Sequence, residues 1–143
     1  QIQTERNTNM LLNLLSEKNK IYFAKLELLL ANIDGNFNES EKRIIEKHCA
    51  EMGITPIEYD DKLSIDDLLD AIQNSMSIKE KKIVYIELLT VALIDNEYHK
   101  KEQELIDSLR QILLIPESVA QEAYDLVSKL IKSSLDIESF IEW

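Results

Sequence analysis

Two pairs of acidic residues recur at the same spacing in this chain, and carboxylate oxygens are the ligands that hard divalent cations prefer. Asp34 is followed seven residues later by Glu41, and Asp95 is followed seven residues later by Glu102. The second pair lies 61 positions after the first. This repetition predicts a carboxylate site that either occurs twice or is assembled from both halves. We therefore expect a divalent-ion site, for calcium or magnesium, with Asp34, Glu41, Asp95 and Glu102 as ligands.

A purely structural role is the alternative for these acids. Asp34 follows an apolar helix, where the helix dipole disfavours a carboxylate by about 0.3–1 kcal/mol unless a cation or a backbone donor compensates. It could instead accept hydrogen bonds from the backbone of its own turn. Glu41 lies three residues after Asn38, which is the spacing of a capping box. In the second copy the equivalent of Asn38 is His99, a poor cap, so capping explains Glu102 less well.

The first pair resembles part of an EF-hand loop but does not complete one. Asp34, Asn36 and Asn38 fit positions 1, 3 and 5 of that loop. Position 6 requires Gly and position 12 requires Glu, whereas this chain has Glu39 and Ile45 there. The second copy fails at the same two positions. The chain is therefore not predicted to contain an EF-hand.

Few other residues have a spacing that suggests chemistry. His48 falls on an apolar helical stripe and is expected to be a packed side chain, whereas His99, beside the second acidic pair, could be a pH-sensitive group or a ligand. Cys49 neighbours His48, but adjacent residues on a helix do not face each other, so a Cys–His nucleophile is not expected. Glu27 and Glu87 interrupt apolar segments and either face solvent or join the acidic cluster. No phosphate loop, zinc spacing or serine nucleophile motif occurs, so we predict no enzymatic activity.

Composition predicts an all-α fold. The 143 residues are 45% hydrophobic and include only two Gly and two Pro, too few for the many turns of a sheet protein. The segments 21–33 and 83–94 are apolar on nearly all sides, which is typical of helices at the centre of a bundle. About eight helices are predicted, with a short closing turn, at roughly 4–17, 20–33, 39–52, 56–60, 65–75, 78–94, 100–114, 117–133 and 137–142.

Several residues mark where these helices begin and end. Ser64 with Asp67, and Ser77 with Glu80, have the spacing of N-terminal caps. Gly53 is placed where a helix should stop. The prolines at 56 and 116 are expected at first helical positions. The terminal aromatic residues Phe140 and Trp143 are expected to cover the core.

The halves of the chain look duplicated. Between positions 21–54 and 82–115, seven of 34 aligned residues are identical, and two of the seven are the acidic matches. Shared core packing would explain the apolar identities but not the acidic ones. We therefore predict a single domain over 1–143, built from two helix–turn–helix units at roughly 20–75 and 78–143 around the two central apolar helices.

These motifs resemble the TerB family of tellurite-resistance domains. The resemblance lies in an apolar helix ending in Asp34-Gly35, then Phe37, then Glu41, and in the recurrence of this pattern in the second half. It extends from about 21 to 134. The chain departs from the family in having Ile33 where Ala is common before the Asp. The second half has Asn where the family has Gly, although Asn accepts left-handed turn geometry. The resemblance implies an all-helical fold, an acidic surface that binds divalent metal, stress-associated protein complexes at the inner membrane face, and no firmly attached enzymatic activity.

Charge and cysteine usage limit the class of partner. A net charge of −11 argues against nucleic acid and against direct docking on an anionic membrane, and it favours cations or basic proteins. No apolar run is long enough to span a membrane, and no signal peptide is evident. One cysteine suits a reducing compartment, so we expect a cytoplasmic protein. The chain begins at Gln1, which suggests a piece of something longer.

Three functions follow in order of preference. The first is a TerB-like domain that binds divalent ions through its acidic patch and protein partners in a stress-associated assembly, which could recruit it to a membrane-associated complex. The second is a metal-free interaction domain of a larger protein. The third is a metal-dependent hydrolase, for which the sequence contains no substrate-binding signature.

Overall fold

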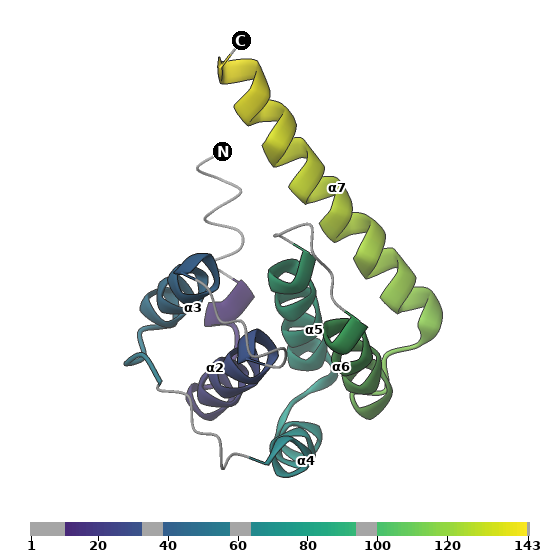
Figure 1. The fold of residues 1–143 in the computed structure, drawn as a ribbon. Coiled ribbons are helices and arrows are strands. Elements are labelled where there is room, and N and C mark those ends of the chain that lie inside the picture. Colours follow the sequence, from purple (N-terminus) through teal and green to yellow (C-terminus); the bar gives the residue numbers. More distant parts are fainter. Residues whose placement is uncertain (1–10, 33–38, 58–63, 94–99, 143) are drawn as a thin grey trace.

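The computed structural model describes residues 11–32, 39–57, 64–93 and 100–142, except for the side chains at positions 40, 101 and 102. Regular structure in these ranges is entirely helical, as predicted (Figure 1). The helices are α2 (Glu17–Asn32), α3 (Glu39–Met52), α4 (Ile65–Ser75), α5 (Ile78–Leu93), α6 (Lys100–Ile112) and α7 (Glu117–Glu142). Within the described ranges, no helix combines the length and apolar character needed to cross a bilayer.

Helices α2 and α5 lie at the centre of the fold, as their apolar sequences predict. Nine of the 16 residues of α2 and eight of the 16 residues of α5 are buried. α2 contacts α3, α4 and α5, whereas α5 contacts α6, α7 and α2. Each central helix therefore has its own covering helices, and contact between α2 and α5 connects the two halves.

The covering helices are amphipathic and turn their apolar stripes inward. The buried side chains of α3, α4 and α6 recur at helical spacing: Ile45, Cys49 and Met52; Leu68, Leu69 and Ile72; and Leu105, Ile106 and Leu109. In α7 the buried positions are Ala120, Ala123 and Val127, all in its first half. The second half of α7 extends away from the other helices (Figure 1).

Helix boundaries in the two halves differ by the same 61 positions as the acidic pairs. α2 and α5 are both 16 residues long and begin at positions 17 and 78. α3 and α6 begin at positions 39 and 100. The segments that contain Asp34 and Asp95 therefore connect corresponding pairs of helices.

The ends of α3 and α6 also correspond. Gly53 has a φ of 71° and Leu114 a φ of 58°, both in the left-handed region. The next residue donates back to the helix in each case: Ile54 N–H to the Cys49 carbonyl and Ile115 N–H to the Arg110 carbonyl, both at 3.0 Å. This is the Schellman arrangement, which normally uses Gly at the left-handed position. The second half uses leucine there, at a cost of about 1–2 kcal/mol.

A hydrogen-bonded group joins the starts of the two central helices. Asn19, buried in the first turn of α2, donates to Glu80 Oε2 at 2.9 Å and accepts from the Ser75 hydroxyl at 2.8 Å. Glu80 also accepts from the Ser16 N–H at 3.1 Å, and Ser77 and Glu80 form the predicted capping box. Partial burial alone would raise the pKa of Glu80, but these hydrogen bonds together lower it below its usual value.

Four predictions about helix extent and packing are wrong. α7 continues to Glu142 without the predicted break before a closing turn at 137–142, because Ser and Asp at 133–136 weaken a helix only slightly and no Gly or Pro interrupts it. Phe140 is 75% exposed instead of covering the core, and Trp143 lies outside the described residues. Position 56 is not helical, and the helix predicted at 4–17 gives way to a turn at positions 14–15.

Candidate functional site

The four predicted metal ligands lie mostly beyond the part of the chain that the structure describes. Asp34 and Asp95 are outside the described residues, as is the side chain of Glu102. Glu41 is described, half-buried in the first turn of α3. Among the residues that are described, no group of three or more His, Cys, Asp or Glu is arranged to hold a metal ion. The divalent-ion site therefore stays a prediction.

A buried acid–histidine cluster lies in the core instead. It consists of Glu27 on α2, His48 on α3 and Glu87 on α5, with Glu27 only 1% and Glu87 only 2% exposed. His48 Nδ1 is hydrogen-bonded to Glu27 Oε2 at 2.8 Å. The His48 ring also packs against Phe23, with centroids 6.0 Å apart. Glu27 Oε1 is buried without a hydrogen-bond partner, an arrangement that costs about 1–3 kcal/mol.

The pKa values of all three groups are raised above their usual values, although burial is the cause only for the two glutamates. Burial raises the pKa of Glu27, and the hydrogen bond and charge of His48 offset only part of that effect. It raises the pKa of Glu87 to about 7, helped by the charges of Glu27 and Glu51 and opposed by His48. Burial alone would lower the pKa of His48, but the hydrogen bond to Glu27 and the surrounding carboxylates raise it. The folded protein therefore retains protons on this cluster to higher pH than the unfolded chain.

The cluster consists of three protonatable side chains inside a packed core. His48 is buried, as predicted, but its partner Glu27 was not foreseen, since a glutamate on an apolar helix was expected to face solvent or the acidic pairs. None of the three residues lines the hollow between α5, α6 and α7 that is described below. Cys49 is also buried, and burial raises the pKa of its thiol, which disfavours the nucleophilic thiolate.

An exposed apolar surface runs along α7. We call it the α7 stripe and define it as Leu126, Leu130, Ile137, Phe140 and Ile141. Their spacing continues, along the same helix, the positions that are buried in its first half. Phe140 is 75% and Ile141 66% exposed, although side chains of this kind dominate protein cores. The stripe is an amphipathic face that the described part of the chain does not cover.

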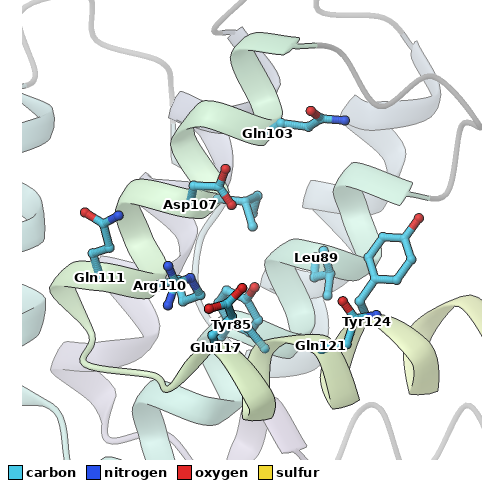
Figure 2. Close-up of a pocket in the computed structure, with 11 residues that line it drawn as sticks. Tyr85, Leu89, Gln103, Asp107, Arg110, Gln111, Glu117, Gln121 and Tyr124 are labelled. Carbon is cyan, nitrogen blue, oxygen red and sulfur yellow. The ribbon is translucent and has the colours of Figure 1, made fainter.

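A hollow of about 410 Å³ lies between α5, α6 and α7. Figure 2 shows that its lining side chains come from all three helices. Most of them are polar and include Tyr85, Asp107, Arg110 and Tyr124. Arg110 is partly engaged, because its Nη1 donates to the Ile115 carbonyl at 3.3 Å. The hollow offers hydrogen-bond donors and acceptors to a polar ligand or to a polypeptide that lies along α7.

Comparisons with known proteins add no assignment. No protein-family model matches the chain, and no curated protein or solved structure that was compared with it matches either.

Proposed function

We propose that this chain is a binding domain without catalytic activity and that the α7 stripe is the surface it presents to a protein partner. The stripe is the observation that carries the proposal. Burying one large apolar side chain contributes about 1.5–3 kcal/mol relative to leaving it in water. Several such side chains lie half or more exposed on one helix, so a partner that covers them gains binding energy from each.

The length of α7 supports this role. It has 26 residues, whereas the other described helices have between 11 and 16. Its last buried residue is Val127 and the last one that packs against the core is Ile131, so the remaining 11 residues are not required to cover the described core. An amphipathic helix that extends beyond its own core is suited to packing against a groove or a helix of another protein.

The test is photocrosslinking in the cells that make the protein. A photoreactive amino acid replaces Leu130 or Phe140 in two variants, and Ile78 in a control. Ile78 is 74% exposed at the start of α5, so it matches the stripe in exposure but lies elsewhere. The proposal expects crosslinked protein adducts from the two stripe positions and not from the control. Adducts from all three positions, or from none, would refute it.

A second function, binding of divalent ions as the TerB resemblance implies, is supported by the matching helix boundaries. Asp34 and Asp95 connect helices that begin 61 positions apart in both halves. We propose that the two halves are duplicated helix–turn–helix units and that calcium or magnesium binds to Asp34, Glu41, Asp95 and Glu102.

Melting of the metal-free protein with added calcium or magnesium tests this second function. An ion that binds only the folded state stabilises it by about 2.7 kcal/mol at a hundredfold excess over the dissociation constant. The increase should disappear in an Asp34→Asn/Asp95→Asn variant and persist in Asp70→Asn, an exposed aspartate on α4. An unchanged melting temperature in the wild type would refute the proposed binding of calcium or magnesium.

The TerB resemblance also implies a cellular setting for this chain. A cytoplasmic, stress-associated assembly, including one recruited to a membrane-associated complex, is the setting that the resemblance implies. A metal-dependent hydrolase is the least favoured function. Metal-stimulated turnover in a panel of phosphoesters and peptides would favour it over a binding role.

A further inference from the structure

The charges on the second half of α7 are sorted along the helix axis. Lys129 and Lys132 lie near its beginning, whereas Asp136, Glu138 and Glu142 lie toward its end. Lys129 and Asp136 lie along the same edge of the α7 stripe, so a second helix of the same sequence that runs antiparallel places Lys129 of each copy beside Asp136 of the other. A parallel helix would instead place like charges together, which is unfavourable. The helix is therefore complementary to itself in one orientation.

The net charge of the whole chain favours the same orientation. Each copy carries −11, so two copies repel when their helical bundles lie side by side. The 15 residues after Val127 form about 22 Å of helix at 1.5 Å per residue. An antiparallel pair of these segments places the two bundles at opposite ends, separated by more than two Debye lengths of about 8 Å at physiological salt.

We infer that the partner of the α7 stripe is a second copy of this chain, bound through an antiparallel pair of α7 segments centred near positions 133 and 134. This inference depends on the proposed function, since it names the occupant of the same surface. About this centre, Leu130 of one copy lies opposite Ile137 of the other, and Leu126 lies opposite Ile141. A contact of about 22 Å is short for a stable complex, so the pair belongs with small interfaces and a dissociation constant on the order of micromolar.

Sedimentation velocity between about 1 µM and 1 mM tests the oligomeric state. The wild-type protein should shift from monomer to dimer over this range. An Ile137→Lys/Ile141→Lys variant should weaken self-association by about 100-fold or more, because two charges then lie in the apolar contact. Ile78→Lys introduces a charge at an equally exposed position outside α7 and should dimerise like the wild type. Far-UV circular dichroism verifies that both variants remain folded.

Charge changes test the orientation. Lys129→Glu/Lys132→Glu should weaken the dimer by about tenfold, and adding Asp136→Lys/Glu138→Lys to that variant should restore it. A disulfide provides a direct readout, because an antiparallel pair places position 129 of one copy near position 136 of the other. Mild oxidation should link Lys129→Cys protein to Asp136→Cys protein and should not link either variant to itself. The only native cysteine, Cys49, is buried.

Three results would overturn the inference. They are a wild-type protein that stays monomeric at 1 mM, a dimer that survives Ile137→Lys/Ile141→Lys, and a disulfide between two Lys129→Cys copies. The proposed function would survive a monomeric result if the stripe positions still formed crosslinks to another protein in cells. It would fail together with the inference only if those crosslinks were also missing.

Discussion

Replacing Glu87 by Gln should remove most of the dependence of stability on pH that this residue imposes. Glu87 is 2% exposed on a central helix, and burial raises its pKa from about 4.5 to about 7. Gln has nearly the same shape and cannot ionise. The substitution therefore separates the burial of a charge from the packing of the side chain.

The sign and the magnitude of the change in the free energy of unfolding with pH follow from the pKa of Glu87 in the unfolded and in the folded chain. Below pH 4.5 both the folded and the unfolded chain hold the Glu87 proton. Between pH 4.5 and 7 only the folded chain holds it, so unfolding releases a proton and the free energy of unfolding falls as the pH rises. One pKa unit corresponds to 1.36 kcal/mol, so the full loss by pH 8 is about 3 kcal/mol. Glu87→Gln should therefore match the wild type at pH 4 and exceed its stability by about 3 kcal/mol at pH 8.

Urea unfolding, followed by circular dichroism from pH 4 to 8, measures this difference. Glu104→Gln, at an exposed position on α6, is the matched control and should follow the wild type. A second readout is the NMR titration of His48, whose pKa should decrease in Glu87→Gln because the charge of Glu87 raises it. Parallel stability curves for Glu87→Gln and the wild type would refute the reasoning, since they would mean that Glu87 is ionised or hydrated in the folded protein.

Three further predictions concern the hydrogen bonds and turns between helices. Asn19→Ala should lower the free energy of unfolding by about 1–3 kcal/mol in urea titrations, because it removes hydrogen bonds between the starts of the central helices, whereas the exposed Asn74→Ala should change it little. Gly53→Ala should cost about 1 kcal/mol through its left-handed backbone alone, since a Cβ there would contact nothing. Leu114→Gly should raise the melting temperature by relieving the same strain, and opposite signs at either position would contradict this account of the helix ends.

Local signals predicted much of the fold. Helical periodicity identified the central and covering helices, because the spacing of apolar residues indicates whether a helix is buried on one side or on all sides. The caps at Ser64 and Ser77 and the stop at Gly53 were predicted because each depends on residues within a few positions. The stop at Leu114 could not be predicted, since leucine rarely adopts a positive φ.

The candidate sites were harder to predict because they depend on contacts between distant parts of the chain. The hydrogen bond between Glu27 and His48 joins residues 21 positions apart on different helices, and no local pattern encodes it. A glutamate within an apolar helix was the available signal, but alone it does not distinguish a solvated side chain from a buried one. The prediction that Phe140 covers the core failed for a related reason. An aromatic residue near a chain end packs on the core only where its helix turns back toward the core.

Hydrogen exchange on α7 connects its stability to its proposed role. A helix of about 15 residues is marginal in water without tertiary contacts, although here it continues from a first half that is already packed. Amides after Ile131 should therefore exchange faster than those near Ala120 and Ala123 in dilute protein, because opening them disrupts none of the described core contacts. If two copies pair through the stripe, protection of these amides should rise with protein concentration in the wild type and not in Ile137→Lys/Ile141→Lys. Strong protection that is independent of concentration would mean that the segment is stabilised within one copy. The α7 stripe would then not be a surface that binds a partner.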